Sequence, residues 1–500
     1  MKKQRRRIYA ALLCSSMVLS LVSMPVSAAE TGQLTNPPTS TEGPGSPESA
    51  SGNEAAAVLN GLYAALPVAN GVKEVATADE LTDALADSSI SIITLKDDVE
   101  ISSTLTVNRT VTLDLNGNVL KMTGSDSVIK VEADGDLTIQ DRNTTTQHTF
   151  NPHCKYQFWY IDMWELDKDG SEIVSGGVIT GGGGDQNNGG GVLVAGGTLT
   201  MAGGSIVGCS ARSRGGGVYL GKDSDTGKSG TFIMTSGSII GCAAQLGGGV
   251  YVTSGCTFVM ATSSNIHNCI ANNDGGGVIN HGTFQMRGGT ISTCTTVAFG
   301  GGGVCNNGTF IMSDGMIKGC TSPDGQYASG GGVRNSNQFT MTGGMIGDPD
   351  NENDASHVYN TSSQETTLTI SGNAKIYTDI TNVGILNADG GEIAGTMTND
   401  TNRYGTGSEG AAGSTEFHGK VTNTGTIRKG TFKNEVINES SGTINGGTFT
   451  GAITNNDGMV LDGDFSGATL NGMLVITFDP NNGDQPSACL LYTSPSPRDP

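Results

Sequence analysis

Cysteines recur at one position of a repeated segment, and thiols spaced in this way could bind a metal or form disulfides. Five of them follow a methionine of the repeat by eight or nine residues: Cys209, Cys242, Cys269, Cys294 and Cys320. If the repeats stack as parallel strands, adjacent cysteines come within the Cα range of a disulfide, but their side chains point the same way, which disfavours the bridge. No CxxC pair occurs, and His267 and His281 do not stand at companion positions for zinc. The pattern predicts a column of buried thiols, with one or more bridges or a zinc site as alternatives.

Aromatic residues that could contact a ligand are concentrated where the repeats are interrupted, in an insertion over residues 142–172. This insertion holds Tyr156, Trp159, Tyr160 and Trp164. Two more rings, Tyr219 and Tyr251, occupy the outward position of repeat strands. Because such rings stack on sugar rings and other flat surfaces, we expect these six residues to contact a ligand. The alternatives are that the insertion is a lateral hairpin packing its rings on the repeats, and that a loop covers the two outward tyrosines.

Acidic side chains alternate in the segment DPDNEND, which presents Asp348, Asp350, Glu352 and Asp354. Carboxylates at alternate positions suit oxygen ligation of Ca²⁺. Asn353 stands where an EF-hand loop needs glycine. The segment is therefore a weak calcium candidate with a solvated acidic loop as the alternative, and the sequence predicts no other cofactor.

The sequence shows no recognisable set of catalytic residues. Enzymes that cleave polysaccharides pair carboxylates and add basic groups from neighbouring strands. The aspartates of the repeats fall at different loop positions and do not align, and we expect Arg214, Arg287 and Arg334 to lack acidic companions. No Ser/His/Asp signature or HExxH motif occurs. We therefore predict no catalytic residues.

Stacked repeats are the elements that must position all of these side chains. A GGGV motif places valines at 192, 218, 250, 278, 304 and 333, so the period is 26 to 32 residues, which is typical of solenoids. Each repeat continues with Leu/Phe-x-Met, in which only the outer residues are consistently large and apolar, and then with a strand carrying isoleucine. Such alternation indicates strands with one buried face. Three strands per coil predict an all-β fold, a right-handed parallel β-helix.

Asparagines and glycines have assigned places in this coil. Asn280, Asn306 and Asn335 replace the apolar residue two positions after the GGGV valine, which predicts a stacked amide ladder inside the coil. The glycines serve corners where a positive φ or close packing is needed. They precede strands and match no GxxxxGK[ST] motif, so they do not indicate a phosphate-binding loop.

The N-terminal residues are expected to direct export. MKKQRRR, an apolar stretch and Val26-Ser27-Ala28 form a signal peptide over residues 1–28; Cys14 as a lipidated residue is a disfavoured alternative. Removing the five basic residues of this segment moves the net charge from −21 to −26. A surface so acidic repels nucleic acid and anionic lipid. No other segment is apolar enough to span a membrane, so we expect a secreted or cell-surface monomer with no nucleic-acid partner.

Domain boundaries follow from shifts in composition. Residues 29–71 are a Pro/Ser/Thr/Gly-rich leader with too few apolar residues to fold. Residues 72–187 form a cap and the first coils; the cap includes a short helix with a capping box at Thr77 and Glu80. Wide coils follow over 188–347 and narrower ones over 348–470, where phenylalanines recur every 16 or 17 residues. Residues 489–500 resemble a translated sequencing adapter.

Two resemblances extend this interpretation. GGGVYV, GTFIMTSGSIIG and GGVITGG make residues 72–470 similar to the right-handed, pectate-lyase-like parallel β-helix surface proteins of Gram-positive gut bacteria. MLVITFDPNNGD resembles the opening strand of a Listeria-Bacteroides repeat, which suggests a small truncated module over 471–488. The first resemblance implies a non-enzymatic adhesin or structural stalk that contacts host or environmental glycans or surface proteins. The alternative is a β-helix polysaccharide lyase or glycoside hydrolase.

Overall fold

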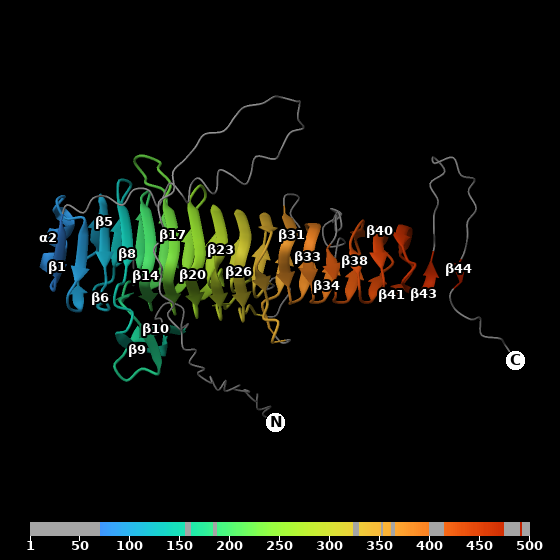
Figure 1. The fold of residues 1–500 in the computed structure, drawn as a ribbon, viewed down its shortest axis with the longest axis horizontal. Coiled ribbons are helices and arrows are strands. Elements are labelled where there is room, and N and C mark those ends of the chain that lie inside the picture. Colours follow the sequence, from blue (N-terminus) through green and yellow to red (C-terminus); the bar gives the residue numbers. More distant parts are fainter. Residues whose placement is uncertain are drawn as a thin grey trace, which may run out of the picture. The chain divides into compact units, whose positions relative to one another are not determined.

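The computed structural model describes residues 71–155, 162–183, 188–323, 330–351, 354–361, 366–399, 415–474 and 491–492. All of these residues belong to one compact unit that begins at Leu66. The unit is a parallel β-helix with a short helix at its N-terminal end, as the sequence predicts (Figure 1). None of the helices in the described part of the chain has the length and apolar character needed to cross a membrane.

One side of the coil is a 16-stranded sheet, called sheet B. It contains the GGGV strands and the strands that take the same place in the other coils. Its strands pair in parallel and in register, Val192 with Val218 and Val218 with Val250. In chain order the strands are β4 (Leu105–Val107), β7 (Ile129–Val131), β13 (Val192–Ala195), β16 (Val218–Gly221), β19 (Val250–Val252), β22 (Val278–Asn280), β25 (Val304–Asn306), β27 (Val333–Asn335), β30 (Val358–Asn360), β32 (Ile380–Asn382), β34 (Met397–Asn399), β36 (Val421–Asn423), β39 (Val436–Asn438), β41 (Ala452–Asn455), β43 (Thr469–Leu474) and the antiparallel β44 (Leu491–Tyr492).

The other two sides of the coil merge into a 21-stranded sheet, called sheet A. In the first coils each side has its own strands. From β14 to β26 one bent strand serves both sides, since the first half of β14 pairs with β8 and the second half with β12. Further along, bent strands such as β31 and separate pairs such as β28 and β29 both occur. The separate strands are β1 (Val72–Val75), β2 (Ile92–Leu95), β3 (Val99–Ile101), β5 (Thr110–Asp114), β6 (Val119–Met122), β8 (Asp136–Gln140) and β12 (Val178–Thr180). The later strands are β14 (Thr198–Val207), β17 (Thr231–Ile240), β20 (Thr257–His267), β23 (Thr283–Ser292), β26 (Thr309–Lys318), β28 (Gln338–Met341), β29 (Met345–Ile346), β31 (Thr367–Ile376), β33 (Ile385–Ile393), β35 (Glu416–Phe417), β37 (Thr426–Ile427), β38 (Thr431–Phe432), β40 (Thr443–Phe449) and β42 (Met459–Asp464).

The predicted inward residues fill the interior in columns. The rings of Phe232, Phe258 and Phe284 are fully buried and stack with centroids 4.8 Å apart. The amide ladder exists and is longer than predicted. It joins nine buried asparagines through Nδ2-to-Oδ1 hydrogen bonds of 2.7–2.9 Å: Asn280, Asn306, Asn335, Asn360, Asn382, Asn399, Asn423, Asn438 and Asn455. Each buried amide is thus paired with the same group in the next coil, which offsets the cost of its burial.

The thiol column is also confirmed. All five repeat cysteines are fully buried and free. Each thiol donates weakly to the carbonyl of the residue two positions earlier, as Cys294 does to Ser292 at 3.3 Å. The third glycine of GGGV makes room for the sulfur, since a Cβ on Gly277 would lie 3.3 Å from Cys294 Sγ.

A fourth strand per coil was not predicted. After the cysteine, the chain forms a four-stranded parallel sheet, here called the flange. Its strands are β15 (Ser210–Arg214), β18 (Ala243–Leu246), β21 (Ile270–Asp274) and β24 (Thr295–Thr296). The chain then returns to sheet B through glycines such as Gly215, where φ is +66° and a Cβ would lie 3.0 Å from Tyr219 Cα.

The insertion is a lateral hairpin. β9 (Gln147–Lys155) pairs antiparallel with β10 (Asp162–Leu166) and β11 (Glu172–Ser175), and the hairpin lies beside the stacked coils in Figure 1. Trp164 anchors it: the ring packs with Phe150, Val207 and Ile240, and the Trp164 amide donates to the Gly241 carbonyl at 3.0 Å. The insertion therefore packs on the coils, which was the alternative interpretation.

Helix α2 (Ala78–Ala86) covers the N-terminal end of the stack, next to β1. Thr77 accepts from the Glu80 amide at 3.3 Å, and Glu80 accepts in return from the Ala76 amide at 2.8 Å. Leu81 and Ala84 bury the apolar face. The helix is the one predicted from the capping box, although its partner amide belongs to Ala76, one residue before the cap.

Candidate functional site

The outward face of sheet B forms the floor of the candidate site. Its side chains follow one another in register, one per coil, starting with Thr106, Lys130, Leu193, Tyr219 and Tyr251. The column continues through Ile279, Cys305, Arg334 and Tyr359. Strand alternation explains this, because the residue between two buried ones must point outward.

The flange forms a wall beside this floor. Arg214, Leu246 and Asp274 occupy one position in three successive flange strands. Leu246 packs against a small apolar cluster on the floor that contains Tyr251 and Ile279. Tyr251 is only 6% exposed as a result. The floor is thus covered at its middle, and Tyr219 on the N-terminal side remains partly exposed.

A pocket of about 420 Å³ lies elsewhere, between the hairpin and the coils, with Lys121 and Glu165 in its lining. The pocket that opens onto the floor is at the N-terminal end of the flange and has a volume of about 330 Å³. Its lining offers hydroxyls, an amide and two charges around one leucine: Thr104, Thr106, Asp126, Ser127, Lys130, Asn188 and Leu193. The Oδ1 atom of Asn188 is buried and has no hydrogen-bond partner in the described part of the chain. A buried acceptor without a partner is costly, so a ligand whose donor reached this atom would remove that cost.

Tyr219 and Arg214 follow this pocket along the stack, and both contact the covered ring of Tyr251. The pocket and these three residues together are called the groove. Tyr219 follows Leu193 in the column and stacks on Tyr251, with ring centroids 5.5 Å apart and planes 22° apart. The Arg214 guanidinium lies over the Tyr251 ring at 5.4 Å. The backbones of Asn188 and Arg214 form a parallel β-bridge at the edge of the flange, so the pocket and the arginine are adjacent.

Burial tunes the titratable groups at the C-terminal side of the groove. It raises the pKa of the Tyr251 phenol and lowers the pKa of His281, whose ring lies 5.4 Å from that of Tyr251. Both groups are therefore neutral near pH 7. The positive charge of Arg214 is the dominant charge among these three side chains.

An acid–base pair that the sequence analysis did not recognise lies at the far end of the flange. Arg334 Nη1 is 3.9 Å from Asp274 Oδ1, so the expectation that Arg334 has no acidic companion is wrong. Coil stacking brings together a floor residue and a flange residue that do not match in repeat position. Burial raises the pKa of Asp274, and burial and Asp274 raise the pKa of the Cys305 thiol to about 12.

Of the other predicted contact residues, Tyr156, Trp159 and Tyr160 lie outside the described residues. Trp164 is 7% exposed, so the expectation that its ring is available on the surface is wrong. Its ring fills the space between hairpin and coils, which was the alternative given for the insertion.

The three calcium candidates within the described residues, Asp348, Asp350 and Asp354, hold a loop in place through hydrogen bonds and an ion pair. Asp354 is buried and accepts from the amides of Gly319 at 3.0 Å and Ser356 at 2.8 Å. Asp348 pairs with Lys318 at 3.0 Å. Asp350 donates its amide to Asp348, and Glu352 lies outside the described residues. Within the described ranges, no three His, Cys, Asp or Glu side chains come together as metal ligands would.

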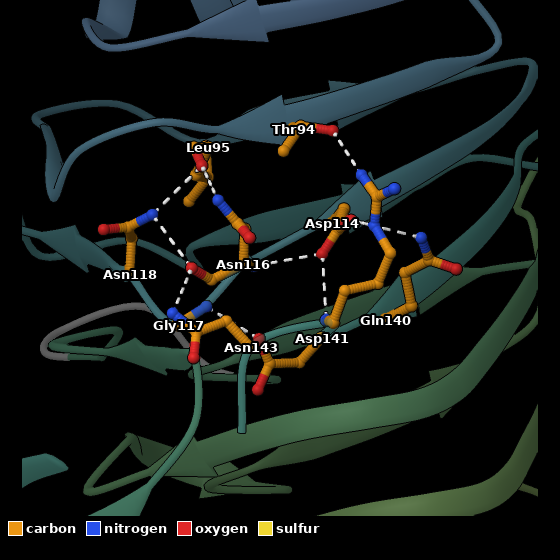
Figure 2. Close-up of polar contacts among 10 residues, drawn as sticks. Thr94, Leu95, Asp114, Asn116, Gly117, Asn118, Gln140, Asp141 and Asn143 are labelled. Atoms are coloured by element: carbon orange, nitrogen blue, oxygen red, sulfur yellow. Dashed lines mark hydrogen bonds and ion pairs between the residues drawn. The ribbon is translucent and has the colours of Figure 1, made fainter. Parts of the chain in front are cut away.

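A buried carboxylate occupies a corner of the first coils (Figure 2). Asp114 is fully buried and accepts from Arg142 Nε, from Gln140 Nε2 at 3.3 Å and from the Asn116 amide at 3.0 Å. Arg142 also reaches the Thr94 hydroxyl at 3.2 Å. Since its oxygens are engaged and inaccessible, Asp114 joins adjacent coils and offers nothing to a polymeric substrate.

Comparison with known proteins places this corner inside a recognised domain. Residues 72–181 match the family model of the pectate lyase-like adhesive domain. No curated protein and no solved structure matches the chain. The match and the stacked parallel strands together support a pectate-lyase-like β-helix. The groove begins within the matched segment, at Thr104 to Lys130, and ends beyond it at Arg214 and Tyr251.

Proposed function

We propose that this chain is a cell-surface or secreted adhesin that binds glycans in the groove. The observation that carries the proposal is the pocket at Asn188, with hydroxyls, an unpaired buried amide oxygen and a partly exposed tyrosine beside it. Sugars present hydroxyls to such polar groups and an apolar ring face to an aromatic side chain. The match to an adhesive domain over the first coils supports the same role.

The groove also suits a chain ligand better than a small molecule. Its floor residues repeat once per coil, so Leu193 and Tyr219 lie one strand spacing apart, about 4.8 Å. A polysaccharide lying along the stack would therefore meet a new side chain about once per sugar unit. The position of the groove on regular strands keeps these contacts fixed, which lowers the entropy cost of binding.

Retention of residues 29–488 on immobilised mucins and plant polysaccharides tests the proposal. We expect saturable binding, weakened about tenfold by Tyr219→Ala because a stacked ring contributes roughly 1–1.5 kcal/mol. Tyr359→Ala is the matched control, since Tyr359 has the same outward position and partial exposure five strands further on. Absence of binding to every glycan, or equal loss in both variants, would contradict the proposed site. Trp159→Ala tests the predicted contact on the insertion separately.

A polysaccharide-cleaving activity is the second candidate, because Asp274 and Arg334 form a carboxylate–guanidinium pair on the same face. Such a pair can supply an acid or base and stabilise a carboxylate or oxyanion. The same samples answer the question: chain fragments that appear with the parent protein and disappear with Asp274→Asn would favour an enzyme. Intact polysaccharide after long incubation would leave binding as the function.

A further inference from the structure

Arg214 holds a positive charge that the groove itself does not neutralise. Among the described residues it forms no ion pair, and its buried Nε atom has no hydrogen-bond partner. Most other partly exposed basic side chains of the coils do have an acid, as Lys130 has Glu132 and Lys121 has Glu100, each at 3.0 Å. A partly buried guanidinium without an acid is costly unless a ligand supplies the negative charge.

The surroundings of Arg214 keep this charge unpaired. On the flange, Leu246 stands between Arg214 and the carboxylate of Asp274, which is taken by Arg334. On the floor, the guanidinium lies over the ring of the neutral Tyr251, which in turn packs beside the neutral His281 imidazole. The Tyr251 ring positions the guanidinium by a cation–π contact. The Arg214 side chain is partly exposed, so its terminal Nη groups can donate to an anionic group.

The pocket at the other end of the groove has the opposite preference. Asp126 lines it, and Lys130 is already paired with Glu132. An anionic group would be repelled there and attracted at Arg214. The net charge of the chain is −21, so the rest of the surface repels anionic polymers. A positive charge at Arg214 therefore confines the binding of an anionic group to this place.

We propose that the groove selects glycans that carry a carboxylate or sulfate group, with Arg214 as the residue that binds the charged group. This inference rests on the proposed glycan-binding function and adds the ligand class to it. The neutral part of the sugar occupies the pocket at Asn188 and the face of Tyr219, and the anionic group lies against the guanidinium.

Matched pairs of mucin test this selectivity: native against enzymatically desialylated, and native against chemically desulfated. We expect native mucin to bind at least tenfold more tightly than one of the treated forms, and which treatment matters identifies the source of the charge. Arg214→Gln should remove that preference, because a charge-assisted hydrogen bond contributes about tenfold or more in affinity. Arg214→Lys should retain part of it, since the charge remains while the bidentate geometry is lost.

Arg287→Gln is the control, because Arg287 lies on sheet A and its Nη2 contacts Gln285 at 2.7 Å. Unchanged far-ultraviolet circular dichroism and melting temperature establish that each variant is folded. Equal binding of native and treated mucins by the parent and by Arg214→Gln would overturn this inference and leave glycan binding intact. No binding to any mucin or polysaccharide would overturn the proposed function itself.

Discussion

Asp114 shows how one buried residue joins coils of the matched domain. Its carboxylate accepts hydrogen bonds from the Asn116 amide just after β5, from the Gln140 side chain at the end of β8, and from the amide and side chain of Arg142 just after β8 (Figure 2). The Arg142 side chain is 62% exposed, so water weakens the ion pair, and the buried acceptors matter more than the charge on the arginine. Nothing in the segment LDLNG distinguishes this aspartate from a surface turn residue, and the sequence analysis did not identify it.

We expect Asp114→Asn to lower the free energy of unfolding by about 2 kcal/mol, because hydrogen bonds to a charged acceptor contribute roughly 1.5–3 kcal/mol. The new NH₂ group would also face the donors of Gln140 and Arg142 in place of an acceptor. Urea unfolding followed by circular dichroism measures the change. Asp134→Asn is the control, since Asp134 is 80% exposed and pairs with Lys228 only at the surface. Equal small effects of the two substitutions would show that the buried carboxylate does not hold the corner.

At the scale of elements, the hairpin docks on a site that only glycine allows. Gly241 has φ of +57°, and a Cβ at this position would lie 2.1 Å from Trp164 Cγ. The coil after it has Asn268, with φ of +55°, at the corresponding corner. The corner conformation itself therefore accepts a side chain, whereas the contact with Trp164 does not.

Gly241→Ala is expected to displace the hairpin while the coils stay folded. The clash removes Trp164 from its apolar site, so its fluorescence should shift to the red and protease should cleave the β9–β10 segment faster. Both proteins carry Trp159→Phe, so that Trp164 is the one tryptophan that emits. Gly227→Ala is a matched control, because its φ of +69° imposes similar backbone strain and nothing lies within 4 Å of the added Cβ. Identical fluorescence and proteolysis in the two variants would contradict this account of docking.

The coil strands could be predicted from sequence and the flange could not, for a physical reason. Phe-x-Met strands bury one face completely, so their alternation is strict, as in Phe284 and Met286. Flange strands such as SARSR and AAQL cover a few floor residues and tolerate many side chains, so they show no period. The wall of the groove is formed by these strands. Because the strands could not be predicted, the sequence did not indicate that Arg214 and Asp274 lie on one wall.

The whole molecule behaves as a one-dimensional array, because each coil contacts its neighbours and little else. Ladders of identical groups run along stretches of it, so neighbouring coils within a stretch present matching groups to each other: phenylalanine on phenylalanine, amide on amide and thiol beside thiol. The amide ladder could have been extended from sequence, since VYN, ITN and VTN repeat the spacing after the GGGV motif has disappeared. The stability of such an array is a sum of coil and interface contributions.

Removing one complete coil should therefore be tolerated where removing half a coil is not. Deletion of residues 278–303 joins Gly277 to Val304, so that Phe258 meets Phe310 and each ladder stays in register, and the retained groove should bind glycans as before. We expect cooperative unfolding with an m-value smaller roughly in proportion to the residues removed. Deletion of residues 278–290 moves every later strand to the wrong side of the coil, which exposes the apolar columns and should cause aggregation or loss of the cooperative transition. Similar behaviour of the two deletions, measured by urea unfolding and light scattering, would show that stability does not reside in the contacts between neighbouring coils.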